Sequence, residues 1–185
     1  MNKKTRLTIL PILGVFFALF LGWSTISGQT IDRFAEYYKE IADLPAGTSF
    51  RIVITEEDAT NIANEYLQRN YESIQNLMQQ AIGIRLDVDN PKIEFGDDMV
   101  TASVRGGKSI LKVGASIQGT MVWSDNRLII DVKSVDVPVI SVDPATVNSY
   151  LHGPLERAVN KGLQYYSVIS FDIEDGYAVL EAIKL

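Results

Sequence analysis

Residues 111–137 read LKVGASIQGTMVWSDNRLIIDVKSVDV, and this segment decides the expected fold. Its first half alternates apolar and polar residues with a period of two, which is typical of a strand with one buried face. Ser124-Asp125-Asn126 is a hairpin turn signal, after which 128–137 returns with Leu128, Ile130 and Val132 on one face. The segment predicts a long antiparallel hairpin in a sheet that is solvated on one side. The apolar face of its first strand would carry Leu111, Val113, Ala115, Ile117, Met121 and Trp123, and the polar face Lys112, Gly114, Ser116, Gln118 and Thr120.

Further strands are expected on both sides of this hairpin. The same alternation occurs at 84–88 and at 100–104, and it resumes at 92–95 after a break at Asn90-Pro91. The chain closes with two strand-like runs, 168–174 and 177–185. Asp175-Gly176 between them is predicted to form a two-residue type I′ turn.

The strongest helical pattern begins at Thr55. Thr55 can cap a helix, and Asp58 three residues later resembles a capping box. Apolar residues then recur at spacings of three and four to about Ile82, before Gly83, which is a natural stop. This spacing predicts a helix of roughly 28 residues, about 40 Å long at 1.5 Å per residue.

These elements together predict an α+β fold, in which the long helix packs against a strongly twisted antiparallel sheet. A second helix is expected to open at Asp143-Pro144 and to be divided at Gly153-Pro154. We expect three parts: an N-terminal transmembrane or signal helix at 1–28, a short helix or stalk at 29–49, and an extracytoplasmic α+β domain at 50–185.

The N-terminal segment has the features of a membrane anchor or export signal. Lys3, Lys4 and Arg6 precede an uncharged, mostly apolar run at 7–23 that ends in Trp23. Its length lies between a spanning helix and a signal-peptide core, so both retention and cleavage stay open. The basic flank predicts a cytoplasmic N-terminus with the rest of the chain outside, as a single-pass membrane protein or, after cleavage, a secreted one.

Composition excludes several classes of site. The chain has 17 Lys and Arg, 23 Asp and Glu and a net charge of −6, and it becomes more acidic beyond the basic N-terminal cluster. Nucleic acid is therefore not an expected partner, and any lipid contact would be hydrophobic. The absence of cysteine excludes disulfides and thiolate metal sites.

The sequence offers no catalytic constellation, so we expect no enzyme, metal site or cofactor. The single histidine, His152, has no nucleophile placed beside it by any recognisable motif. Asp87-Val88-Asp89-Asn90 resembles the start of a calcium loop but lacks its Gly and distal Glu. Gly106-Gly107-Lys108-Ser109 resembles part of a phosphate loop but reads more simply as a hairpin turn.

Long apolar stripes remain, and they have two interpretations. They form an ordinary core, or sheet and helix enclose an elongated groove suited to acyl chains. The groove residues would be Ile62, Tyr66, Ile74, Leu77, Met78, Leu111, Val113, Ile117, Met121, Trp123, Leu128 and Ile130. The alternative function is a non-catalytic protein-interaction module of the cell envelope that docks through Lys112, Ser116, Gln118 and Thr120.

The order of these features resembles two families, the YpmS-like membrane-anchored proteins of Gram-positive bacteria and the LmeA-like phospholipid-binding proteins. The likeness rests on Ile54-Thr55-Glu56-Glu57-Asp58, on Val135-Asp136-Val137-Pro138-Val139 and on the closing strands around Asp175-Gly176. It spans roughly 50–185 and implies a tubular lipid-binding fold, with a sheet wrapped around a long helix and no catalytic residues.

Overall fold

The computed structural model describes residues 41–69, 71–72, 75–76, 87–96, 98–108, 111–137, 143–151, 163 and 165–185. The predicted N-terminal anchor, most of the stalk and the predicted helix break at 153–154 lie outside these residues. Within the described part of the chain, no helix is long and apolar enough to cross a membrane.

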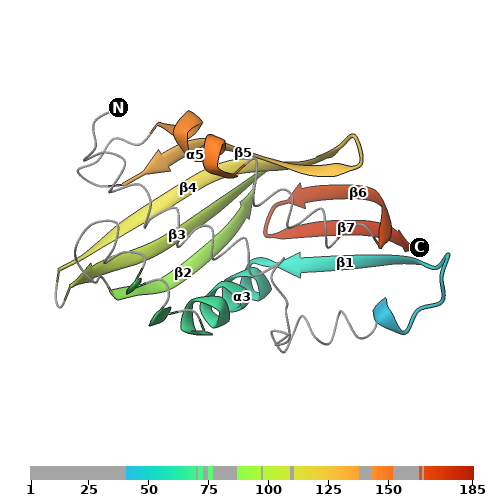
Figure 1. Ribbon diagram of the computed structural model, residues 1–185, viewed down its shortest axis with the longest axis horizontal. Coiled ribbons are helices and arrows are strands. Elements are labelled where there is room, and N and C mark those ends of the chain that lie inside the picture. The colour runs from blue at the N-terminus through green and yellow to red at the C-terminus, as the bar shows by residue number, and fades with distance from the viewer. Residues whose placement is uncertain are drawn as a thin grey trace.

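Two antiparallel sheets make up most of the described structure (Figure 1). The four-stranded sheet has the order β2-β3-β4-β5, with β2 at Asp87–Gly96, β3 at Met99–Lys108, β4 at Leu111–Ser124 and β5 at Arg127–Asp136. The three-stranded sheet has the order β1-β7-β6, with β1 at Ser49–Thr55, β6 at Tyr166–Glu174 and β7 at Tyr177–Lys184. The hairpin predicted at 111–137 is β4–β5.

The predicted fold class is wrong, because the described structure is mainly β and holds no long helix. Helix α3 spans Glu56–Arg69, 14 residues, and α5 spans Pro144–Leu151, 8 residues. A long helix was expected from the apolar spacing after Thr55, and it was expected to pack against the apolar face of the sheet. Within the described residues, part of that face packs against the three-stranded sheet, since Val168 and Phe171 belong to the same core cluster as Ile117. The short helices contribute Ala63 of α3 and Val147 of α5 to the same cluster.

The β6–β7 turn joins the two sheets near their ends. The Gly176 N–H donates to Phe95 O at the end of β2 (3.0 Å), and the Glu56 N–H donates to Gly176 O at the start of α3 (3.2 Å). Gly176 has φ of +84°, a conformation that costs glycine little. The molecule is therefore extended along its strands, with the free end of the three-stranded sheet at one extreme (Figure 1).

Side chains of α3 and α5 form hydrogen bonds with the two edge strands of the four-stranded sheet. At β2, Thr60 Oγ1 accepts the Ile93 N–H (2.9 Å) and donates to Ile93 O (3.4 Å). At β5, Asn148 Oδ1 accepts the Val132 N–H (2.8 Å) and its Nδ2 donates to Val132 O (3.0 Å). Each helix thus gives one edge residue both hydrogen bonds that a further strand would offer, which protects the sheet from pairing with other chains.

Thr60→Val is expected to destabilise the domain by roughly 1–3 kcal/mol, because it leaves the Ile93 N–H and C=O without their partner at a part-buried position. Thr60→Ser, which keeps the hydroxyl, should retain most of the stability. Urea unfolding followed by far-UV circular dichroism measures both variants. A loss of stability in the Ser variant with none in the Val variant would show that the Thr60 methyl group, and not its hydroxyl, carries the contribution.

Candidate functional site

Four of the residues predicted to line an apolar groove are buried. Their exposed fractions are 7% for Ile62, 5% for Ile117, 2% for Leu128 and 3% for Ile130. The last three belong to one core cluster, in which β4 and β5 pack against the three-stranded sheet. Side chains this buried are packed against other protein atoms, which is the arrangement of an ordinary core.

The other predicted groove residues are placed differently. Met121 and Trp123, near the end of β4, are partly buried against the core cluster. Tyr66 lies in α3, and Leu111 and Val113 lie in β4, but their side chains are outside the description. Ile74, Leu77 and Met78 lie outside the described residues. The structure therefore brings together Ile117, Leu128 and Ile130 in one cluster, with Met121 and Trp123 packed against it. It does not describe the predicted helical residues beyond Tyr66.

A row of polar side chains crosses the four-stranded sheet, one from each strand. The strand register pairs Lys92 of β2 with Ser103 of β3, Ser103 with Ser116 of β4, and Ser116 with Asp136 of β5. Ser103 and Ser116 alternate along their strands with the buried Ala102 and Ile117, so the row lies on the face turned away from the core. Cross-strand neighbours of this kind are close enough to contact one ligand together.

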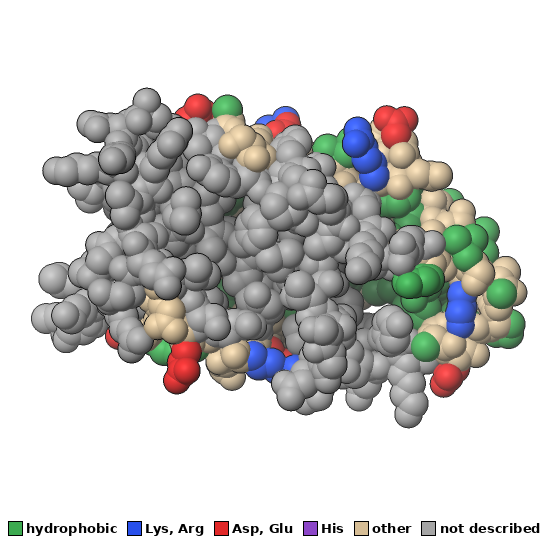
Figure 2. Space-filling model, viewed as in Figure 1, with side chains coloured by type: hydrophobic (Ala, Val, Ile, Leu, Met, Phe, Trp, Pro, Cys, Tyr) green, Lys and Arg blue, Asp and Glu red, His purple; other side chains and the backbone are tan. Residues whose placement is uncertain are grey.

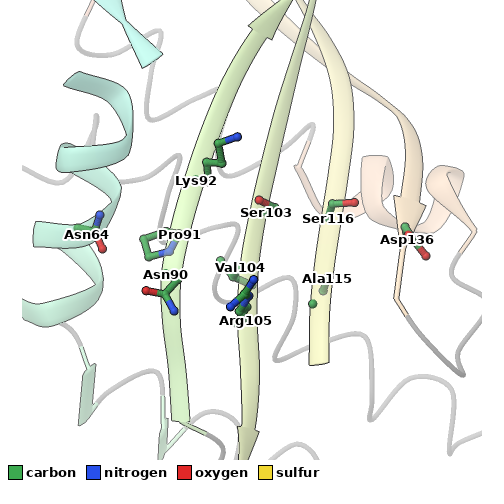
Figure 3. Close-up of a pocket in the computed structure, with 11 residues that line it drawn as sticks. Asn64, Asn90, Pro91, Lys92, Ser103, Val104, Arg105, Ala115, Ser116 and Asp136 are labelled. Carbon is green, nitrogen blue, oxygen red and sulfur yellow. The ribbon is translucent and has the colours of Figure 1, made fainter. Parts of the chain in front are cut away.

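This polar row lines a hollow of about 770 Å³ (Figure 3). Figure 3 shows the lining residues in spatial order, from Asn64 on α3, across β2, β3 and β4, to Asp136 on β5. The volume lies within the range of small-ligand sites. The remaining lining residues are Asn90, Pro91, Val104, Arg105, Gly114 and Ala115.

The charged side chains that line the hollow differ in whether they have an ion-pair partner. Lys92 Nζ pairs with Glu94 Oε1 (2.5 Å), and this hydrogen bond, together with the Glu94 charge, raises the pKa of Lys92. Arg105 is exposed and has no ion-pair partner among the described residues. Asp136 at the other end of the row is also exposed. The hollow therefore offers a cationic end at β2–β3, serine hydroxyls in its middle and a carboxylate at β5.

Sequence reasoning identified only part of this site. Ser116 was named as a docking residue with Gln118 and Thr120, and the three do lie on one face of β4. Lys112 is in β4, but its side chain is outside the description. Lys92, Ser103, Arg105 and Asp136 were missed, because alternation assigns a residue to a face but does not give the register between strands.

In the described part of the chain, no group of three His, Cys, Asp or Glu side chains could hold a metal ion. The single histidine, His152, for which no catalytic role is expected, lies outside the described residues. Comparison with protein-family models gives no match for the chain, and none of the curated proteins searched matches it either.

Proposed function

We propose that this chain is a non-catalytic protein-interaction module of the cell envelope, tethered to the membrane by residues 7–23, which docks its partner in the polar hollow of the four-stranded sheet. The observation that carries the proposal is the row Lys92, Ser103, Ser116 and Asp136, with Arg105 beside it. An exposed arginine without an ion-pair partner among the described residues is a ready donor for an acidic group.

The proposal also implies a charge pattern on the partner. Neighbouring strands lie about 4.8 Å apart, so three strand spacings separate Lys92 from Asp136 by about 14 Å along the row. A complementary surface would present a carboxylate opposite Arg105 and Lys92, and a basic group about 14 Å away opposite Asp136. Such charge complementarity contributes mainly to specificity and to the rate of association.

Arg105→Glu is expected to reduce partner binding by about tenfold or more, since it replaces an attraction with a repulsion worth at least about 1.4 kcal/mol. The measurement is photo-crosslinking of the full chain in its own cells, with a benzophenone amino acid in place of Ser116. A protein adduct of defined mass should form, fall with Arg105→Glu and largely persist with Arg105→Lys. Arg105 is exposed, so stability should stay within about 0.5 kcal/mol.

The control carries the same photo-crosslinker in place of Asp172, an exposed residue of β6 on the other sheet. An adduct that forms equally from position 172, or that does not respond to Arg105→Glu, would contradict docking in the hollow.

A second candidate function is lipid handling, which the resemblance to the YpmS-like and LmeA-like proteins implies. It is favoured by one observation: Met121 and Trp123 are only partly buried, and the intervening Val122 is 51% exposed. The end of the β4–β5 hairpin therefore presents apolar surface that an acyl chain could cover. Native mass spectrometry of the full chain would decide this case, because a bound lipid of defined mass that is lost in Met121→Glu would support it.

A further inference from the structure

The charge pattern implied for the partner is present on this chain itself. Lys92 of β2 lies at one end of the polar row and Asp136 of β5 at the other, and both are exposed. The short side chains of Ser103 and Ser116 lie between them (Figure 3). A row that is cationic at one end, neutral in the middle and anionic at the other end is complementary to its own reverse. A second copy of the chain, turned end for end along the row, therefore matches it in charge.

One symmetry operation brings two such rows together. A twofold axis that runs parallel to the strands, midway between β3 and β4 and between the two copies, places the sheets face to face and reverses the row. Lys92 of each copy then lies opposite Asp136 of the other. Ser103 of each copy lies opposite Ser116 of the other. Because a twofold interface uses the same surface on both copies, each of these contacts occurs twice.

The neighbouring rows of the same face agree with this arrangement. Arg105 pairs with Gly114 in the strand register, so the axis sets Arg105 of each copy opposite Gly114 of the other. A Cβ at Gly114 would meet no atom within 4 Å, which leaves room for the long arginine side chain. In the row on the other side, Glu94 would face Ser134 of the second copy. Within these three rows, no two described side chains of like charge face each other.

The side chains have the lengths that such a contact needs. Sheets that pack face to face lie about 10 Å apart, a gap that a lysine and an aspartate side chain bridge together. The Lys92 ammonium has three donors, so it can keep its hydrogen bond to Glu94 Oε1 and also donate to Asp136 of the second copy. The serine side chains are shorter, so the two hollows enclose a shared space in which water bridges the hydroxyls.

The contact is small, so the pairing is expected to be weak. Four strands about 4.8 Å apart, each contributing about five residues, give a patch of roughly 300 Å² on each copy. Stable protein interfaces bury roughly 800 Å² per partner. The net charge of −6 also opposes self-association. However, Figure 2 shows Lys and Arg side chains beside Asp and Glu side chains at the margin of the molecule, so the visible charge is not gathered into one acidic face.

We propose that the partner docked by this face is a second copy of the chain, and that the two form a weak twofold dimer. Its reciprocal contacts join Lys92 to Asp136 and lay Arg105 over Gly114. The inference rests on the proposed function, because it names the partner of the same polar row. Any other protein that binds the row would compete with the dimer.

An exchange of charge between two copies tests this pairing. Two differently tagged full-length chains would be produced in the same cells, one of them with the benzophenone amino acid in place of Ser116. We expect an adduct of twice the mass of the chain that contains both tags. Lys92→Asp in both copies, or Asp136→Lys in both, should reduce its yield by about tenfold or more, because both reciprocal contacts become repulsive.

Lys92→Asp in one copy combined with Asp136→Lys in the other should restore the adduct to at least about half of its original yield, because each charge again faces its opposite. A defect in folding would not be repaired by this combination. Asp172→Lys, the same change of charge at an exposed position of β6, is the matched control and should leave the yield unchanged.

The outcomes separate this inference from the proposed function. An adduct with a different protein would overturn self-pairing and leave docking at the polar row in place. Absence of any adduct would contradict docking at the row as well. An adduct of two copies that the exchanged pair does not restore would overturn the reciprocal contact between Lys92 and Asp136.

Discussion

Gly119→Ala is expected to destabilise the domain by roughly 2–3 kcal/mol, in the upper part of the range for small-to-large changes at packed sites. A Cβ at position 119 would lie 2.7 Å from Asp131 O and 3.1 Å from Val132 Cα. Both atoms belong to the backbone of β5, so no side-chain rotation can relieve the contact. Relief would require β4 and β5 to separate locally.

The close approach arises from a β-bulge in β5. Gln118 pairs with Ser134 but Gly119 pairs with Val132, so Lys133 is the extra residue. Without this shift, Val135 would lie opposite Ser116. With it, Asp136 lies there instead, and Val135 joins Ile117 against the core. Gly119 thus permits the bulge that completes the polar row.

Gly114→Ala, on the same strand, is the matched control. A Cβ at position 114 would meet no atom within 4 Å, and the residue is exposed. The change should alter the free energy of unfolding by less than about 0.5 kcal/mol in urea unfolding. If Gly119→Ala were as mild as Gly114→Ala, β5 would be free to move, and the register that places Asp136 would not be fixed.

Local patterns in this sequence predict where strands and turns lie, but not always the type of a turn or the end of a strand. The expected turn at Asp125-Asn126 has φ of +52° and +59°, both positive as in a type I′ turn. The type I′ turn predicted at Asp175-Gly176 is in the right place but is of the wrong type, because only Gly176 has positive φ. Asn90-Pro91 does not end a strand either, since β2 continues through it with a register shift between Asp89 and Lys92.

Packing and strand register between segments that are far apart in the chain were harder to predict from the sequence. The helical period after Thr55 gives the face of α3 but not the partner of that face, and it does not reveal that the three-stranded sheet shares the core cluster. The end of the row depends on a register shift in β5, because without it Val135 and not Asp136 would lie opposite Ser116. A register shift is set by backbone packing across the sheet, so it leaves little trace in the alternation of one strand.

The change expected to cost the most stability is Leu128→Ala, at about 3 kcal/mol within the usual range of roughly 2–5 kcal/mol for buried leucines. Leu128 is 2% exposed, pairs with Trp123 across the β4–β5 hairpin and belongs to the cluster that joins the two sheets. Val122→Ala, at a position 51% exposed on the same hairpin, is the control and should change stability by less than about 0.5 kcal/mol.

Leu128→Ala also separates the two interpretations of the apolar stripe. If Leu128 is a core residue, its truncation should destabilise the domain. The mass of any copurifying molecule should then be unchanged in the fraction of the protein that remains folded. As a groove residue it would tolerate truncation, because an open groove has no packed neighbours to lose, and the variant would then bind less lipid. Urea unfolding and native mass spectrometry of the same preparation give the two readouts. The burial of Leu128 within a cluster that spans both sheets favours the first outcome, in which the apolar faces hold the sheets together.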